Sequence, residues 1–274
     1  MFSIYRTETG YTIEKDSSCV LAQDFCLDTL FTSEDPLKYT EFQFESGQSC
    51  DLPSGALLAP VRSQEVWAAG VTYYRSRDAR MEESESSGGD RFYDMVYEAE
   101  RPELFFKATA NRSRGHLHKV CIRSDSSWDV PEPELTLAIN SNGKVFGYTV
   151  GNDMSSRSIE GENPLYLPQA KVYRGSCALG PCLVVGSGPD KEAIISVKIS
   201  RAGEVVFSGN TEVSQIKRTF DELAEFLFRD NEFPNGALLM TGTGVVPDSD
   251  FTLSSGDLIS ISIDGIGTLE NEVE

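Results

Sequence analysis

Residues 147–181 read GYTVGNDMSSRSIEGENPLYLPQAKVYRGSCALGP, and the acid within this stretch, Asp153, has partners upstream. Glu132 and Glu134 stand two residues apart, so on an extended segment both carboxylates point to the same side. A strand, a turn and a second strand are predicted over 135–150, and this unit would bring Asp153 back beside the two glutamates. The spacing therefore predicts that three carboxylates converge.

Three converging carboxylates repel one another unless positive charge neutralises them. The sequence offers no obvious cationic partner, which favours a bound divalent ion, and oxygen-only ligands favour magnesium, manganese or calcium over zinc or copper. The alternative is that Glu132, Glu134 and Asp153 are three surface acids among the 43 acidic residues of the chain. Spacing by itself leaves both interpretations open.

The rest of the chain predicts a protein built mainly of strands. Apolar and polar residues alternate over 195–200 and 259–264, which is typical of half-buried antiparallel strands. Ala202-Gly203 follows the first of these runs and predicts a hairpin. Short strands are also expected at 2–6 and 11–14. With Pro and Gly punctuation before residue 60, the pattern suggests a small N-terminal domain over 1–60 and a larger domain over 61–274.

Three helices are predicted. One runs to residue 229 with Ser214 as its cap, because apolar residues recur at helical spacing from 216 to 227. The other two cover GVTYYRSRDARMEESE at 70–85 and the segment 92–98, with a Ser-Gly joint at 86–89 between them.

The composition argues against nucleic-acid and membrane partners. The 43 acidic and 24 basic residues give a formal charge of −19, which repels phosphate backbones and anionic membrane surfaces. The six cysteines show no CxxC pair, which favours reduced, buried thiols. The start lacks a signal-peptide pattern and no apolar run nears the roughly 18 residues of a membrane span, so a cytoplasmic protein is expected.

Several spaced motifs resemble the fumarylacetoacetate hydrolase superfamily, whose core has a Glu-x-Glu strand, a Gly-x-Asp segment followed by an Arg, and a Lys before an aromatic residue and an "LGP" turn. The corresponding residues here are Glu132, Glu134, Asp153, Arg157, Lys171 and Leu179-Gly180-Pro181. The glycine-rich sequence from Thr241 to Asn271 is also similar. The resemblance covers roughly 63–274 and implies a mixed α/β, mainly β fold, with a β-roll core and a small N-terminal α+β module.

The resemblance implies a magnesium-type ion, with manganese or calcium as alternatives, and usually a homodimer. Glu132, Glu134 and Asp153 would hold the ion, and a 2-oxo acid substrate would chelate it through carboxylate and ketone oxygens. The resemblance makes Lys171 a catalytic candidate, and Lys107, Arg157 and Thr243 are candidates for substrate binding. The alternatives are ordinary solvated lysines and a turn threonine.

The chain departs from the hydrolases of this superfamily in one motif. Those enzymes carry a Gly-x-Asn-Tyr-x-x-His-x-x-Glu type stretch whose His–Glu pair activates water. Here Thr72, Ser76 and Ala79 take the places of the Asn, His and Glu. A serine hydroxyl cannot act as a base near neutral pH in place of imidazole, so hydrolysis by that route is not expected.

The stretches 70–84 and 101–107 look more like the branch that contains 2-keto-3-deoxy sugar acid dehydratases. In that interpretation Tyr73 and Arg77 bind the substrate, and Arg75, Glu82 and Glu83 are catalytic candidates, with either glutamate as acid or base. For each charged residue of this stretch the alternative is a solvated helix with weak ion pairs.

We therefore expect a magnesium-dependent lyase that dehydrates a 2-keto-3-deoxy aldonic acid, such as a pentonate, in sugar catabolism. Two alternatives stay open. One is hydrolysis of a C–C bond in an acylpyruvate, a fumarylacetoacetate-like compound or a diketo-deoxy sugar acid. The other is a relative that binds a metabolite and its metal without turnover.

Overall fold

The computed structural model describes residues 1–73 and 95–274, and strands dominate this part of the chain. Ten strands form the path of a large sheet in the order β4-β3-β2-β1-β12-β10-β9-β15-β5-β6, and β7 pairs with β12 off this path. The fold class is the expected one, mixed and mainly β. The strands of this sheet are β1 Phe2–Thr7, β2 Gly10–Lys15, β3 Ser18–Ala22, β4 Gln48–Ser49, β5 Glu65–Gly70, β6 Glu103–Ala108, β7 Ser113–Arg114, β9 Pro133–Ile139, β10 Val145–Asp153, β12 Cys177–Val185 and β15 Ala237–Met240.

A second sheet of four strands packs against the large one. Its order is β14-β13-β16-β17, with bounds Glu204–Glu212, Ile194–Arg201, Leu258–Ile263 and Gly267–Glu272. The predicted hairpin is confirmed, because β13 and β14 pair antiparallel on either side of Ala202 and Gly203. Isoleucines of β13 and β16 share one buried cluster with Leu135 and Val150 of the large sheet. This cluster joins the two sheets.

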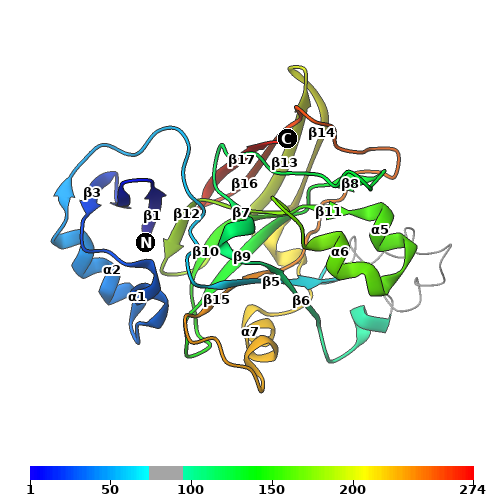
Figure 1. The fold of residues 1–274 in the computed structure, drawn as a ribbon. Helices are drawn as coiled ribbons and strands as arrows, with labels where there is room; N and C mark the ends of the chain where they lie inside the picture. The colour runs from blue at the N-terminus through cyan, green and yellow to red at the C-terminus, as the bar shows by residue number, and fades with distance from the viewer. Residues whose placement is uncertain (74–94) are drawn as a thin grey trace.

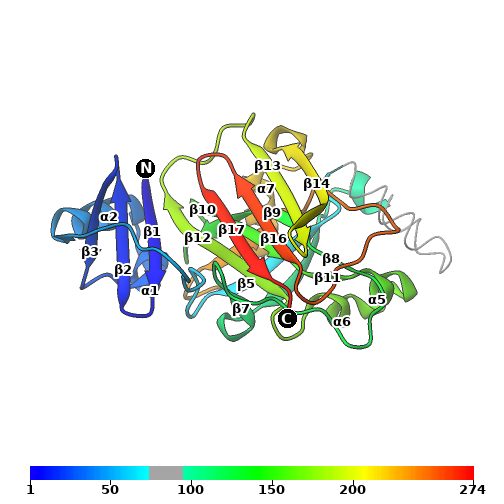
Figure 2. The same cartoon turned by 90° about the horizontal axis from the view of Figure 1, so that it is seen from above.

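The N-terminal strands extend the large sheet. Figures 1 and 2 show β1, β2 and β3 with helices α1 (Leu27–Thr32) and α2 (Pro36–Glu45) at one side of the molecule. β1 pairs with β12, and the Arg6 guanidinium donates hydrogen bonds to the carbonyls of Ala59 and Val61. The predicted strands here are confirmed, while the domain boundary near residue 60 stays a prediction.

The helix predicted from Ser214 begins later. Residues Val213–Gln215 form a single 3-10 turn, η4, and helix α7 covers Phe220–Phe228 with Thr219 as its cap. The prediction of Ser214 as the cap was wrong, because tertiary contacts hold the chain between η4 and α7 in a non-helical conformation. Ile216 forms a bridge with Tyr73, and the Lys217 N–H donates to the carbonyl of Thr72. α7 then packs its apolar face on β9 and β15.

The remaining elements flank the large sheet. They are η2 Ala110–Arg112, β8 Asp129–Val130, β11 Ser155–Ser156, α5 Arg157–Glu162, η3 Pro164–Tyr166 and α6 Leu167–Lys171. Of the predicted helix over 70–85, residues 70–73 are described and are not helical, since Gly70 ends β5. The rest of this segment and the joint at 86–89 lie outside the described residues. Of the segment 92–98, residues 95–98 are described and are helical. Within the described ranges, no helix is both long and apolar enough to cross a membrane.

The tripeptide Leu179-Gly180-Pro181 is not the turn that the resemblance implied. It lies inside β12, opposite β10, and the register between these strands shifts between Tyr148 and Val150. The chain therefore accommodates this tripeptide as an irregularity within a continuous strand. All six cysteines are free thiols, as expected, and three of them are buried.

The sheet topology brings one end of five strands together. β15 runs parallel to β5 and antiparallel to β9, while β10 is antiparallel to β9 and β6 to β5. The C-terminal ends of β5, β10 and β15 therefore lie beside the N-terminal ends of β6 and β9. Glu132, Glu134 and Asp153 all stand at this end of the sheet.

Phe31 joins the N-terminal helices to the large sheet, which makes its truncation informative. Its buried ring meets Phe146 of β10 edge to face at 5.0 Å, and its carbonyl accepts a hydrogen bond from the Ser141 N–H. We expect Phe31→Ala to lower the free energy of unfolding by about 3–5 kcal/mol, the usual loss for a buried aromatic side chain. Urea titration measures this loss. The matched control is Phe42→Ala on α2, where the ring is 64% exposed; equally small losses in both variants would contradict the packing role of Phe31.

Candidate active site

The three predicted carboxylates do converge. Glu132 directly precedes β9, Glu134 is the second residue of β9, and Asp153 ends β10. One carboxylate oxygen from each lies within 4.8 Å of the others, and all three residues are buried. Antiparallel pairing fixes this arrangement, because Gly151 faces Glu134 in the ladder and the Asp153 N–H donates to the Glu132 carbonyl at 3.0 Å.

The expectation that these carboxylates lack cationic partners was wrong. Arg157, at the start of α5, donates from Nη2 to Glu132 Oε1 at 2.7 Å. Lys171 Nζ lies 2.9 Å from Glu132 Oε2, and Lys107 Nζ lies 2.5 Å from Asp153 Oδ1. The cations come from β6, α5 and α6, which are distant from β9 in the sequence, so the local pattern around Glu132 could not reveal them.

The ammonium groups of Lys107 and Lys171 direct their N–H donors to acceptors of the protein itself. Lys171 Nζ reaches Glu132 Oε2, Asp153 Oδ2 at 3.2 Å and Ser155 Oγ at 2.6 Å. Lys107 Nζ reaches Asp153 Oδ1, the Met154 carbonyl at 3.0 Å and the Lys171 carbonyl at 2.5 Å. An ammonium group has three donors. Each lysine therefore has as many protein acceptors as donors.

The electrostatics differ between two of the acids. Burial, together with the charges of Asp153 and Glu132, raises the pKa of Glu134 well above its usual value. Burial would also raise the pKa of Asp153, but Lys107 and Lys171 outweigh it and lower that pKa. Glu134 is therefore harder to ionise than Asp153 without further positive charge beside it.

A glycine after β15 completes the support of Glu134. The Gly242 N–H donates to Glu134 Oε2 at 2.7 Å, and Gly242 has φ +92°, a conformation that favours glycine. A Cβ at this position would stand 2.0 Å from the hydroxyl oxygen of Thr72. Only glycine can bring its backbone this close to the carboxylate.

The donor set suits a hard divalent cation. Three carboxylates offer oxygen ligands within the distance that one ion can bridge, and magnesium and calcium bind such oxygen sets. Glu132, Glu134 and Asp153 also line one pocket, whose water-accessible volume of about 10 Å³ has room for roughly one water or ion. The residues therefore fit a magnesium-type ion.

The other walls of this pocket are largely backbone and apolar. They come from the end of β5, from β6 and from the turn after β15, and their residues are Ala69, Gly70, Val71, Phe105, Gly242 and Thr243, with Arg157 beside the acids. Val71 has φ +53°, which is strained for a β-branched residue. Thr243 lies in the wall, and its hydroxyl donates to the Val245 carbonyl at 3.1 Å. The substrate contact predicted for Thr243 stays a prediction.

Tyr73 lies close to this centre. It is buried, and an isolated bridge pairs it with Ile216 before α7. Burial, together with the charge of Glu134, raises the pKa of its phenol. The structure thus places Tyr73 beside the carboxylate set, where the substrate contact predicted for it would have to form.

Four further predicted site residues fall outside the described part of the chain. These are Arg75, Arg77, Glu82 and Glu83. Ser76 and Ala79, on which the departure from the hydrolase pattern rests, fall outside it as well.

Two residues that hydrogen-bond to the carboxylates or to a lysine that holds them were not predicted from the sequence. Ser155 accepts the hydrogen bond of Lys171, and Gly242 donates to Glu134. Ser155 stands two residues after Asp153, so the period of an extended chain could have placed both on one side. For Gly242 the indication in the sequence was weaker, namely that this glycine stands next to the candidate residue Thr243.

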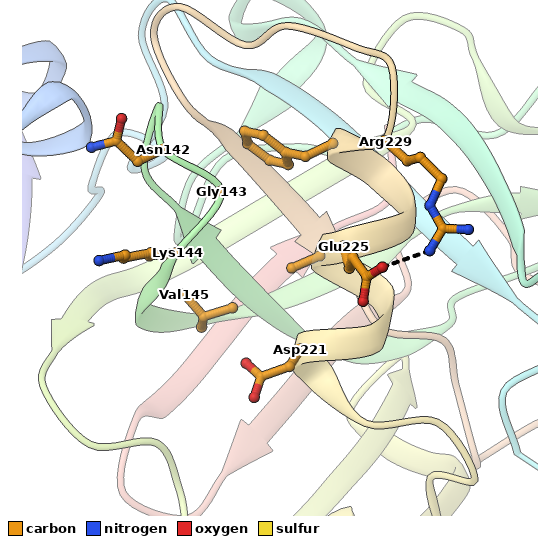
Figure 3. A pocket seen from close by; sticks show the side chains of 9 residues that line it. Asn142, Gly143, Lys144, Val145, Asp221, Glu225 and Arg229 are labelled. Atoms are coloured by element: carbon orange, nitrogen blue, oxygen red, sulfur yellow. Dashed lines mark hydrogen bonds and ion pairs between the residues drawn. The ribbon is translucent and has the colours of Figure 1, made fainter.

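A larger hollow lies elsewhere, between the β9–β10 turn and α7 (Figure 3). It measures about 650 Å³, and its charged rim includes Lys144, Asp221 and the ion pair Glu225–Arg229 at 2.6 Å. None of the carboxylates at the end of the sheet lines it. Among residues 1–73 and 95–274, buried acids, cations and glycine backbone converge at the carboxylate set, which makes this set the candidate active site.

Comparison with known proteins identifies the family of the chain. Residues 95–274 match the sequence model of the family described as Fumarylacetoacetate (FAA) hydrolase C-terminal. The chain is 50% identical over 216 residues to a probable 2-keto-3-deoxyxylonate dehydratase of Haloferax volcanii, covering 78% of this chain and 73% of that protein. It is 44% identical over 222 residues to a 2-dehydro-3-deoxy-D-arabinonate dehydratase of Saccharolobus solfataricus, covering 80% and 74%.

Solved structures give the same result. The structure of a 2-keto-3-deoxy-D-arabinonate dehydratase complexed with magnesium and 2,5-dioxopentanoate superposes with a TM-score of 0.84 at 34% identity, over 100% of this chain and 98% of that one. A fumarylacetoacetate hydrolase from Exiguobacterium antarcticum shares the fold, with a TM-score of 0.72 at 21% identity over 100% of this chain and 98% of that one. The chain therefore belongs to the fumarylacetoacetate hydrolase family.

Proposed function

We propose that this protein dehydrates a 2-keto-3-deoxy pentonate with the help of a magnesium-type ion. The observation that carries the proposal is the complete buried set of Glu132, Glu134 and Asp153 in a chain 44–50% identical to dehydratases of such acids. The relative that is complexed with magnesium and 2,5-dioxopentanoate supports the same product class.

The reaction removes one water from a five-carbon acid. A hydrogen leaves C3, its electron pair forms a C2–C3 double bond, and the C4–O bond then breaks as the C3–C4 double bond forms. A proton shift from C5 to C3 then gives an enol with a C4–C5 double bond. Transfer of the C5 hydroxyl proton to C4 converts this enol to the dioxo acid, so the substrate loses only water overall. A bound divalent cation supplies Lewis-acid stabilisation of the negative charge that develops on the C2 oxygen.

In this proposal the residues of the centre divide into three groups. Glu132, Glu134 and Asp153 hold the ion. Arg157, Lys107 and Lys171 hold the carboxylates in place and offset part of their charge. The remaining predicted residues, Tyr73, Thr243, Arg75, Arg77, Glu82 and Glu83, stay candidates for contact with the substrate or for proton transfer.

We assign Lys171 a positioning role. Its three donors face Glu132, Asp153 and Ser155, and a base would need a free lone pair on that nitrogen. Lys171 thus keeps two ligands of the ion at a fixed separation. Lys107 does the same for Asp153 and ties β6 to the end of α6 through the Lys171 carbonyl.

The proposal also includes a cytoplasmic location and a homodimer. The first rests on the composition and the second on the resemblance to the family. Nucleic acids and membranes are not among the proposed partners, given a formal charge of −19.

The activity itself is the first prediction of this proposal. With magnesium, the purified protein should convert 2-keto-3-deoxy-arabinonate or 2-keto-3-deoxy-xylonate to 2,5-dioxopentanoate, which an aldehyde assay or ¹H NMR detects. Excess chelator should abolish the conversion, and added magnesium should restore it. Acylpyruvates serve as the comparison substrates. Release of pyruvate and a carboxylic acid from them, with the sugar acids unchanged, would favour the hydrolase instead.

The second prediction concerns the ion. A ligand that binds only the folded state raises stability by about 2.7 kcal/mol at 100 times its Kd, so magnesium should raise the Tm of the protein. Asp153→Asn should remove this magnesium-dependent increase and lower turnover at least 100-fold, because it deletes a ligand charge. Differential scanning fluorimetry with a magnesium titration measures the effect.

The increment with magnesium is the quantity to compare, because Asp153→Asn also leaves Lys107 and Lys171 without a buried counter-charge. Removing one partner of a buried ion pair costs about 3–5 kcal/mol, so the Tm without metal should fall as well. Asp24→Asn, at an exposed position of the N-terminal part, is the matched control. A full magnesium response in Asp153→Asn would refute the assignment of the ligands.

A further inference from the structure

We propose that Cys19 and Cys50 are a site of reversible oxidation, at which a peroxide converts the two thiols to a disulfide that fastens the edge of the large sheet. The inference goes beyond the proposed function, because neither thiol lines the pocket of the candidate active site. Cys19 belongs to β3, and Cys50 directly follows β4. Figure 2 shows β3 at the outer side of the molecule, away from β9 and β10.

The pairing of β3 with β4 sets the two cysteines opposite each other. Val20 faces Ser49 in this antiparallel ladder. One step further along the ladder stand Cys19 and Cys50, and the Cys50 N–H donates to the Cys19 carbonyl at 3.0 Å. Residues that lie directly opposite in such a ladder point to the same side of the sheet. The two thiol side chains therefore share one face.

The spacing of such a pair suits a disulfide. At a hydrogen-bonded position of an antiparallel ladder the two Cα atoms lie about 5.5 Å apart. Disulfides join Cα atoms about 4.4–6.8 Å apart, most often about 5.5–6 Å. Burial and the charges of Glu14, Cys50 and Asp51 raise the pKa of the Cys19 thiol, so the two thiols lie within electrostatic reach of each other. The backbone thus already holds the pair near the separation that the bond requires.

The pair lies on the face of the sheet that α1 leaves open. Ile13 of β2 packs with Leu27 of α1 in the core. Its neighbour Glu14 points to the other face, because successive side chains of a strand alternate, and Glu14 pairs with Cys19 in the ladder. Cys19 and Cys50 are both partly exposed, whereas three of the other four cysteines are buried. A small oxidant can therefore reach the pair from solvent.

A peroxide is the oxidant that fits these surroundings. Glu14 and Asp51 place negative charge beside the pair, and the whole chain has a formal charge of −19, which repels anionic oxidants. Hydrogen peroxide is small and neutral, so these charges do not exclude it. The thiolate is the reactive form, and the raised pKa of Cys19 keeps that form scarce at neutral pH. Oxidation therefore requires peroxide in large excess over the protein.

The reaction balances with one peroxide for each pair of thiols. The first sulfur attacks the peroxide, so that an S–O bond forms, the O–O bond breaks, and a sulfenic acid and one water result. The second thiol then attacks this sulfur, the S–S bond forms as the S–O bond breaks, and a second water leaves. The two sulfurs lose two electrons, which the peroxide oxygens gain. Exchange with a thiol reductant such as dithiothreitol reverses the oxidation.

The disulfide closes a segment whose end has little support of its own. β4 has only two residues, both exposed, and stands at the edge of the large sheet. The closed segment carries α1 and α2, and with them Phe31, whose ring packs against Phe146 of β10. Because a cross-link restricts the unfolded chain, we expect oxidation to raise the Tm by roughly 5 °C or more. Turnover of the proposed substrate should stay within twofold of the reduced protein.

Peptide mapping without reduction tests the proposal. Trypsin combined with a protease that cleaves before aspartate separates Cys19 from Cys26, because Asp24 lies between them. After treatment of the reduced protein with hydrogen peroxide, tandem mass spectrometry should find one cross-linked peptide pair that joins Cys19 to Cys50 and is lighter by two hydrogens. Dithiothreitol should separate it. Cys19→Ser and Cys50→Ser should each lose the cross-link and the rise in Tm.

Cys26→Ser is the matched control. Cys26 is partly exposed like the pair. Burial raises the pKa of its thiol, but hydrogen bonds with Thr29 and Asp28 outweigh burial and lower it, so Cys26 is the thiol that peroxide should attack readily without a neighbour to close a disulfide. The Cys26→Ser variant should therefore keep both the cross-link and the rise in Tm.

The possible outcomes separate this inference from the proposed function. A protein that forms the cross-link and dehydrates no sugar acid would support the cysteine pair and reject only the proposed substrate. Oxidation of Cys26 while Cys19 and Cys50 stay thiols would overturn the inference. So would a sulfinic acid at Cys19 or Cys50 without a cross-link, a disulfide that joins two chains, or a Tm that does not change when the cross-link forms.

Discussion

The buried ion cluster at one end of the large sheet is the constraint around which the rest of the site is arranged. Glu132 and Asp153 lie out of water, and burying a carboxylate is costly unless it is paired and hydrogen-bonded. Arg157, Lys107 and Lys171 provide that pairing from three other elements. α5, α6 and β6 are therefore fixed relative to β9 and β10 by charge as well as by packing.

Strand register gives this cluster its geometry. Side chains alternate with a period of two, so a slip of one residue in β9 would turn Glu134 away from Asp153. Apolar contacts oppose such a slip, because Leu135 and Leu137 of β9 are fully buried in different core clusters. The same packing that stabilises the sheet thus sets the spacing of the metal ligands, and the active site needs no separate scaffold.

The sequence predicted those parts of the site that depend on local period. Glu132 and Glu134 are two residues apart, and the strand pair that follows returns Asp153 to them, as the structure shows. It did not predict where Lys107 and Lys171 direct their charge, because those contacts span 46 and 18 residues. The predicted cap of α7 was wrong for a similar reason. The Lys217 N–H donates to the Thr72 carbonyl, and local helix propensity does not reveal this long-range contact.

The full engagement of the lysines also limits the chemistry that the centre can perform. A lysine that donates to three acceptors fixes carboxylates well and exchanges protons poorly. Proton transfer must then fall to a group outside the cluster that still faces the pocket. Lys107 of β6 belongs to the cluster, and Phe105, two residues before it on the same strand, lines the pocket. One strand thus supplies both a cation that holds the carboxylates and a part of the pocket wall.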